Sequence, residues 1–165
     1  SQNNWADAGV ARQEEAYPNM ELVPDARVAD DSDAEKAYQL TKELITKYPD
    51  LKGILGTGSF DAPGCARAIE ELGLSGQVFA ISVALPSEVK DYLKNGTLQS
   101  VGLWDPAISA KVMLNTAVKL FAGDTVETGS DLGEEGYESV IVDGTLITGN
   151  GAIAITAENV DQFTF

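Results

Sequence analysis

The sequence predicts an α/β fold built on a parallel sheet, and three observations lead to it. Short apolar segments alternate with amphipathic stretches of helical length along most of the 165 residues. The segment 77–83 is apolar almost throughout, which is typical of a strand covered on both faces. Connections of helical length between successive strands require a parallel sheet with right-handed crossovers.

The first hundred residues predict four helices and several short strands. Asn3 or Asn4 can cap a first helix, which Pro18 helps to end. A loose alternation of apolar residues over 20–28 predicts a strand, and Asp33 can cap the second helix. The elements expected after it are a strand at 52–58, a helix beginning at 61–63, the strand at 77–83, a helix beginning at Pro86 and ending at Asn95-Gly96, and a strand at 97–103.

The last third of the chain begins with a strong helix start. Asp105 is a good cap, and Pro106 is preorganised for the first helical position. Gly123 closes this helix, and the segments 137–142 and 145–148 flank an Asp-Gly turn and predict a hairpin. A short apolar piece at 152–155 and a short helix at 157–163 follow. The residues of the long helix expected to face inward are Ile108, Val112, Met113, Ala117 and Leu120.

Composition excludes several classes of function. Eleven basic and 26 acidic residues give a net charge of −15, which disfavours nucleic acid and anionic membranes as partners. The chain contains no histidine, so it cannot form a Ser-His-Asp triad or a histidine-ligated zinc site. The single cysteine, Cys65, can form no internal disulfide, and its small-residue surroundings predict a buried thiol. We expect no metal and no cofactor.

Parallel sheets bind ligands outside the carboxyl ends of their strands. That rule selects three loops, at residues 57–61, 83–86 and 103–105. The first loop lacks the lysine-containing ending of a phosphate-binding loop. It is either a tight strand-to-helix turn or a rim on which the hydroxyls of Thr57 and Ser59 meet a ligand.

Trp104 and Asp105 suit carbohydrate recognition. A tryptophan can stack on the apolar face of a sugar ring, while a carboxylate accepts two hydroxyl hydrogen bonds. Spacing alone favours the alternative, in which Trp104 is a core residue and Asp105 is only a helix cap. A third interpretation makes Asp61 and Asp105 the acid and base of a glycosidase.

Four segments, at residues 1–5, 48–54, 102–106 and 159–165, resemble type I periplasmic binding proteins. The branch they resemble is that of the autoinducer-2, rhamnose and ribose-type carriers of ABC importers. The resemblance covers the whole chain but only the C-terminal half of a family member. It implies one parallel-sheet, three-layer lobe, with a C-terminal hairpin and helix that belong partly to a missing lobe. Residues 1–104 are then the C-terminal ligand-binding lobe without its first strand. Residues 105–165 are the hinge crossing, helix and terminal strands that return towards the absent N-terminal lobe.

The resemblance also implies ligand-binding positions. Gln2 matches a ligand-contacting glutamine of the autoinducer-2 carriers, whereas Ser1 stands where they have aspartate. Thr57 and Ser59 stand where those carriers line the ligand with proline and alanine, so a pentose, deoxyhexose or similar polyol is expected instead. Trp104 and Asp105 lie at the hinge crossing, where sugar-binding relatives place polar contacts.

The function implied by the resemblance is non-catalytic capture of a small neutral sugar. The full-length protein would deliver the sugar to an ABC permease from a periplasmic or membrane-anchored extracellular position, with its signal outside this chain. The orphaned apolar face predicts self-association of the chain. Two rivals remain: the effector core of a LacI-type transcription regulator and a sugar-processing enzyme on a doubly wound fold.

Overall fold

The computed structural model describes residues 2–24 and 26–164. The chain forms two compact units. The first unit contains the residues up to 102 and those from 154 onward, and the second contains residues 103–153. Among the described residues, no helix is both long enough and apolar enough to cross a bilayer.

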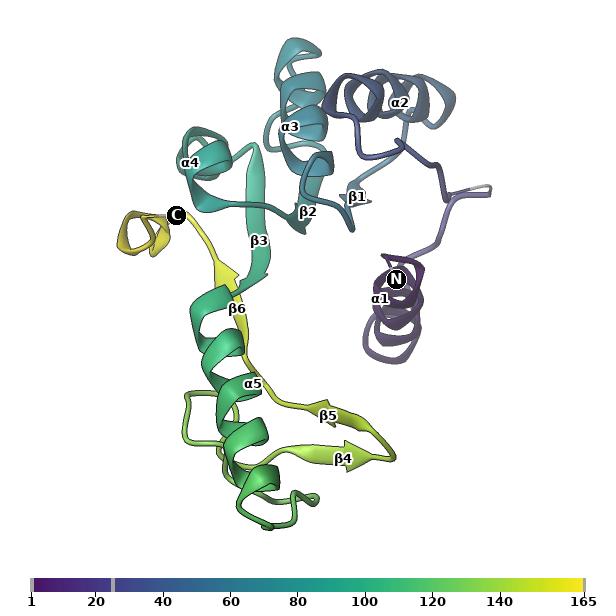
Figure 1. The fold of residues 1–165 in the computed structure, drawn as a ribbon. Helices are drawn as coiled ribbons and strands as arrows, with labels where there is room; N and C mark the ends of the chain where they lie inside the picture. Colours follow the sequence, from purple (N-terminus) through teal and green to yellow (C-terminus); the bar gives the residue numbers. More distant parts are fainter. Residues whose placement is uncertain (1, 25, 165) are drawn as a thin grey trace. The chain divides into compact units, whose positions relative to one another are not determined.

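A four-stranded sheet organises the fold, in the order β1 (Gly53–Leu55), β2 (Phe79–Val83), β3 (Leu98–Trp104) and β6 (Ala152–Ile155). β1 pairs parallel with β2, and β2 pairs parallel with β3 (Figure 1). The predicted α/β fold with a parallel sheet is therefore confirmed. Because the strands are parallel, the loops that follow β1 and β2 leave the sheet at the same edge.

Three helices of the first unit connect these strands or precede them: α2 (Ala34–Lys47), α3 (Asp61–Glu71) and α4 (Pro86–Lys94). α2 and α3 lie side by side (Figure 1), and Gly64 permits their close approach. A Cβ at Gly64 would stand 2.6 Å from the carbonyl oxygen of Ala34, so only glycine fits there. The largest fully buried side chains of this unit's core include Ile69, Val89, Leu93, Leu98 and Val101.

One face of β2 is more exposed to solvent than the sequence predicts. Phe79 and Ile81 are 45% and 44% exposed, whereas the alternate residues Ala80 and Ser82 are buried. The helix α1 (Gln2–Ala16) approaches Leu55 but buries none of its own residues. The prediction that segment 77–83 is covered on both faces is therefore wrong, because α1 does not seal the second face.

The predicted strand at 20–28 is also wrong, since its described residues form no strand. Pro24 has no N–H to donate to a ladder. Side chains hold this connection instead. Gln13 Nε2 donates to the carbonyl oxygen of Met20 over 2.6 Å, and the Tyr48 hydroxyl donates to that of Pro24 over 2.5 Å.

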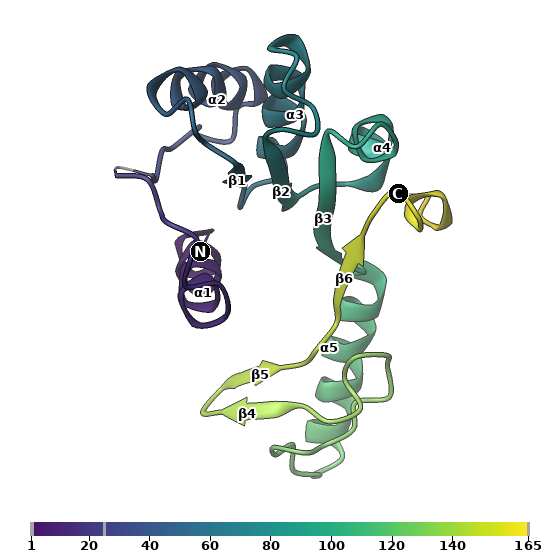
Figure 2. The ribbon, with the colours of Figure 1, turned by 180° about the vertical axis from the view of Figure 1, so that it is seen from behind.

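In the second unit, α5 (Pro106–Phe121) packs against the hairpin of β4 (Ile141–Asp143) and β5 (Leu146–Thr148), as Figure 2 shows. Val112, Leu132 and Val140 form its buried core. The hairpin prediction is confirmed, although its first strand begins at Ile141 instead of residue 137; the Asp105 cap and the end of the helix before Gly123 are also confirmed.

Two residues predicted to face inward on α5 do not. Met113 is 67% exposed and Leu120 is 56% exposed. The inner side of α5 is fixed by Val112 and by Asn115, whose amide donates to the carbonyl oxygen of Leu132 over 2.8 Å. Met113 and Leu120 lie about a quarter of a turn away from that side, so they face outward.

The chain ends in a short 3-10 helix at Val160–Gln162 instead of the longer helix predicted at 157–163. Asp161 in this turn forms ion pairs of 2.6 Å with both Lys90 and Lys94 of α4. These contacts tie the end of the chain to α4.

Candidate functional site

The loop that follows β1 is closed by the first residue of α3. The Oδ2 atom of Asp61 accepts hydrogen bonds from the backbone N–H groups of Thr57, at 2.7 Å, and Gly58, at 2.8 Å. Both predicted alternatives for this loop remain compatible with its shape. It is a tight turn, and the hydroxyls of Thr57 and Ser59 make no hydrogen bond to other described residues.

β2 supports the same loop from the side. The hydroxyl of Ser82 donates to the carbonyl oxygen of Gly58 over 3.2 Å. Gly56 lets the strands and loop approach, because a Cβ there would stand 2.3 Å from Ser82 Oγ and 2.6 Å from Asp61 Cβ. The turn is thus held on two sides.

The structure brings Gln2 to this loop as well. A Cβ at Gly58 would stand 3.1 Å from Gln2 Nε2, so the amide of Gln2 lies beside the loop backbone. Gln2 and Ser59 are exposed and Thr57 is half-buried. Three of the five predicted ligand-binding residues, Gln2, Thr57 and Ser59, therefore gather at one strand end. Ser1 lies outside the described residues.

Asp61 is held in a partly buried environment. Burial raises the pKa of Asp61, and the neighbouring Asp30 carboxylate raises it further, while the Gly58 and Thr57 N–H groups act against this rise. The carboxylate faces its own loop, where two amides occupy Oδ2. This engagement makes Asp61 a loop-holding residue and leaves it poorly placed as a glycosidase acid.

Trp104 and Asp105 lie at the junction of β3 and α5 and are 42% exposed and half-buried, respectively. Asp105 Oδ1 accepts hydrogen bonds from the N–H groups of Ala107, at 2.7 Å, and Ile108, at 3.3 Å. The cap role is therefore observed. These two residues belong to the second unit, and the loop after β1 belongs to the first.

Two further observations bear on what this site can hold. Across residues 2–24 and 26–164, no cluster of three metal-ligating side chains of histidine, cysteine, aspartate or glutamate occurs. One shallow hollow lies along α2, and another is lined by residues of α3 and α4. With Gln2 and Ser59 exposed and Thr57 half-buried, the loop after β1 is an open rim carrying hydroxyl and amide groups.

The sequence does not predict the support that Ser82 gives to this loop, and it predicts Asp61 only as an acid or a helix start. One local signal was available for Asp61: an aspartate three or four residues after a turn can accept the free N–H groups of that turn. No comparable signal points to Ser82, because its contact with Gly58 depends on the pairing of β1 with β2.

A family profile described as periplasmic binding protein domain matches residues 1–125. The chain belongs to the periplasmic binding protein family. Among curated proteins, the D-ribose/D-allose-binding protein of Pseudomonas aeruginosa is 30% identical over 97 residues. That match covers 59% of this chain and 30% of the relative.

Solved structures of other periplasmic binding proteins have the same fold. A sugar ABC transporter protein from Actinomyces odontolyticus superposes with a TM-score of 0.82 at 25% identity, over 99% of this chain and 53% of its own. LsrB from Clostridium saccharobutylicum, in complex with AI-2, superposes with a TM-score of 0.75 at 24% identity. The superposition covers 99% of this chain and 55% of the LsrB chain. The chain thus spans about half the length of these two structures.

Proposed function

We propose that the chain is a lobe of a solute-binding protein that captures a small neutral sugar for an ABC importer and performs no catalysis. The observation that carries the proposal is the gathering of Gln2, Thr57 and Ser59 at the carboxyl end of β1, where parallel sheets bind ligands. A related protein that matches 59% of this chain is named for ribose and allose binding.

The chemistry of the rim fits this ligand class. Thr57 and Ser59 offer hydroxyls, and Gln2 offers an amide that both donates and accepts, as a polyol requires. We assign Trp104 a stacking role on the sugar ring. The Oδ1 atom of Asp105 already accepts the N–H groups of the helix start, so we assign its Oδ2 atom a hydrogen bond from a sugar hydroxyl. A pentose, a deoxyhexose or a similar polyol is the proposed ligand.

An open rim cannot bury a ligand, whereas binding sites enclose most of a small ligand's surface. We therefore assign residues 1–104 to one ligand-binding lobe and residues 105–165 to the crossing and terminal elements that join it to a second lobe. The partner of the whole protein is then a membrane permease, and its location is periplasmic or extracellular. The net charge of −15 argues against a nucleic-acid partner.

Two single substitutions test the site. Thr57→Val removes one hydroxyl at constant shape, and Ser59→Ala removes the other. In a protein that contains this chain, each is expected to weaken sugar binding by about 0.5–1.5 kcal/mol in calorimetric titration. Thr46→Val, on the exposed side of α2, is the matched control and should leave affinity unchanged. Equal affinity in all three variants would remove the loop from the site.

The binding proposal is distinguished from an enzyme by turnover. Incubation with D-ribose, L-rhamnose and D-xylose should return each sugar chemically unchanged. Conversion that survives Thr57→Val but is lost in Asp105→Asn would support the enzyme instead.

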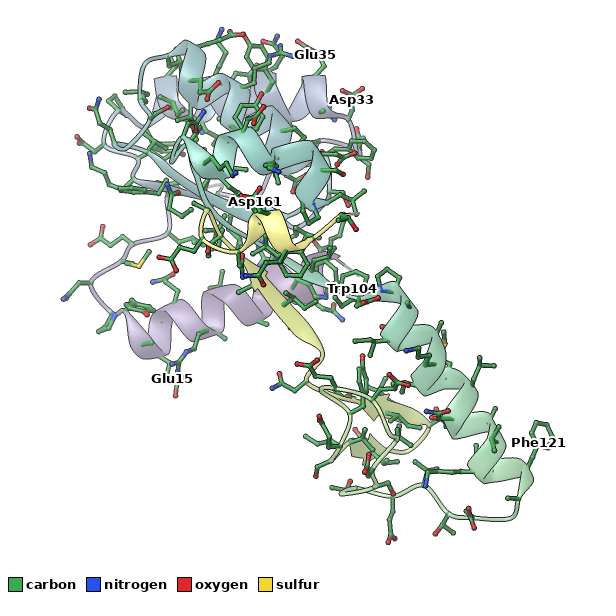
Figure 3. All side chains as sticks on the ribbon, turned by 90° about the vertical axis from the view of Figure 1, so that its left-hand side faces the viewer. Glu15, Asp33, Glu35, Trp104, Phe121 and Asp161 are labelled. Atoms are coloured by element: carbon green, nitrogen blue, oxygen red, sulfur yellow. The ribbon has the colours of Figure 1, made fainter. Side chains whose placement is uncertain are left out.

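We also propose that the chain by itself associates with a second copy through the outer face of α5. Five large apolar residues lie exposed on α5, with Phe121 at 93% exposure and projecting from the helix end in Figure 3. α5 carries two lysines and no acidic residue. Two copies that meet through this face therefore bring no acidic side chains of α5 together, although the chain has a net charge of −15. The exposed residues are Met113, Leu114, Val118, Leu120 and Phe121.

Sedimentation equilibrium tests this association. Phe121→Glu should shift the chain towards monomer, whereas Leu72→Glu, which changes an exposed apolar residue of the other unit, should not. A wild-type chain that is monomeric at all concentrations would contradict the proposal.

A further inference from the structure

Two polar side-chain atoms flank Gly58 in the loop that follows β1. A Cβ at Gly58 would stand 3.0 Å from Asp61 Oδ1 and 3.1 Å from Gln2 Nε2. Outside residues 57–59, these are the two heavy atoms nearest to that position. The carboxylate oxygen accepts hydrogen bonds, and the amide nitrogen donates them. An acceptor from α3 and a donor from α1 therefore lie on the same side of Gly58.

The hydrogen bonds of the loop fix the orientation of Asp61. Its Oδ2 atom accepts the N–H groups of Thr57, at 2.7 Å, and Gly58, at 2.8 Å. These two bonds favour the ionised form of the carboxyl, against the burial that raises its pKa, and the position of Asp61 at the start of α3 favours that form as well. Oδ2 thus holds the turn, while Oδ1 is the oxygen that lies beside Gly58.

The packing of α1 against the end of β1 brings Gln2 to the same place. A Cβ at Gly9 in the middle of α1 would stand only 3.0 Å from Leu55 Cδ2. Gln2 is the first residue of α1 and is exposed, whereas Gly58 and Asp61 are half-buried. The amide and the carboxylate are therefore within reach of a ligand that approaches the loop from solvent.

Gly58 leaves room for such a ligand. Its φ does not lie in the left-handed region, so the backbone at this position does not require glycine. What glycine provides here is space, because any side chain would begin 3.0 Å from Asp61 Oδ1 and 3.1 Å from Gln2 Nε2. A hydroxyl group suits this space, since it has one proton to donate to the carboxylate and lone pairs to accept from the amide.

We propose that Asp61 Oδ1 and Gln2 Nε2 bind the same hydroxyl group of the captured sugar, next to the Cα of Gly58, and that Asp61 is a specificity-determining residue. This assignment rests on the proposed function and adds a residue to its site. Asp61 then holds the turn through Oδ2 and binds the ligand through Oδ1. A sugar that lacks this hydroxyl, or that carries an anionic group in its place, has no proton for Oδ1 and binds more weakly.

Calorimetric titration of a protein that contains this chain, with D-ribose, L-rhamnose and D-xylose as probes, tests the proposal. Asp61→Asn keeps one oxygen for the N–H groups of the turn but puts an NH₂ group in place of Oδ1. Affinity for the sugar that the wild type binds should therefore fall about tenfold or more, the scale of a hydrogen bond to a charged group.

Gly58→Ala is an independent variant, because it leaves the carboxylate and the amide in place and fills the space between them and the Cα. It should weaken binding of the same sugar. The double variant with Asp61→Asn should lose less affinity than the two separate losses combined, since both changes disrupt one contact.

Two matched controls separate this contact from a general effect on the fold. Asp33→Asn corresponds to Asp61→Asn, because Asp33 also accepts two backbone N–H groups at a helix start. Gly53→Ala corresponds to Gly58→Ala, since its Cβ would have no neighbour closer than 3.9 Å. Both controls should bind sugar as the wild type does.

The possible results distinguish the two proposals. Wild-type affinity in Asp61→Asn or in Gly58→Ala, or an equal loss in the matched controls, overturns the role given to Asp61 and leaves sugar binding by the wild type intact. If the folded wild type binds none of the three sugars, the proposed function is overturned and the role of Asp61 with it.

Discussion

The hydroxyl of Ser82, on β2, donates a hydrogen bond to the carbonyl oxygen of Gly58, 3.2 Å away in the loop after β1. This contact joins a strand to the turn that carries Thr57 and Ser59. Together with the Asp61 carboxylate on the other side, it fixes the turn at the edge where the loops after β1 and β2 leave the sheet. The candidate site therefore depends on small residues that leave room for these bonds.

Gly56→Ala should destabilise the chain by about 1–3 kcal/mol, because the new Cβ would stand 2.3 Å from Ser82 Oγ and force the strand and loop apart. Gly53→Ala is the matched control, since its Cβ would have no neighbour closer than Phe79 O at 3.9 Å. Urea unfolding measures both free energies. Equal effects of the two substitutions would show that the close approach at Gly56 is unimportant.

Asp105→Asn should separate helix capping from ligand binding. Asparagine caps helices as well as aspartate does, so the free energy of unfolding should change by less than about 0.5 kcal/mol. Sugar affinity should fall by about 1.5–3 kcal/mol, the value of a hydrogen bond to a charged group. Asp33→Asn, at the cap of α2, should change neither quantity. Undiminished affinity in Asp105→Asn would assign Asp105 to capping alone.

The start of α5 also shows how much of this protein could be predicted from its sequence. Asp33, Asp105 and the Asp-Gly hairpin turn carry local signals, and the structure confirms all three. The outward positions of Met113 and Leu120 could not be predicted, because they depend on which side of α5 the hairpin covers. The missed contact between Ser82 and Gly58 likewise joins segments far apart in the chain.

Asp161 should give the chain stability that acid removes. Hydrogen bonds from Lys90, then Lys94, lower the pKa of Asp161 to about 2. Its contribution is therefore present above the ordinary aspartate pKa of about 3.9 and is lost as the pH falls through about 2. Asp161→Asn should lower Tm at neutral pH, with the difference from wild type vanishing near pH 2.

Asp50→Asn serves as the control for that comparison. Asp50 is exposed and forms no ion pair within the described residues, so its replacement should leave Tm unchanged across the same range. A constant Tm difference between Asp161→Asn and wild type at every pH would contradict the role given to the two lysines.

Cys65 should resist thiol reagents in the folded chain. It is buried at 6% exposure, its Sγ accepts a hydrogen bond from Thr41 Oγ1 at 3.1 Å, and burial raises its pKa to about 11. The predicted core thiol is thus confirmed as buried. Ellman's reagent at neutral pH should label Cys65 only after urea unfolding. Rapid labelling under native conditions would show that α2 and α3 separate readily at this point.

Calorimetric titration of a protein that contains this chain, against D-ribose, L-rhamnose, D-xylose and autoinducer-2, tests the central claim most directly. We expect one neutral sugar to bind tightly, and Trp104→Ala to weaken that binding by about 1–3 kcal/mol, by analogy with base–aromatic stacking. If the folded protein gave no heat of binding with any of these sugars, the assignment of sugar binding to these strand-end loops would be contradicted.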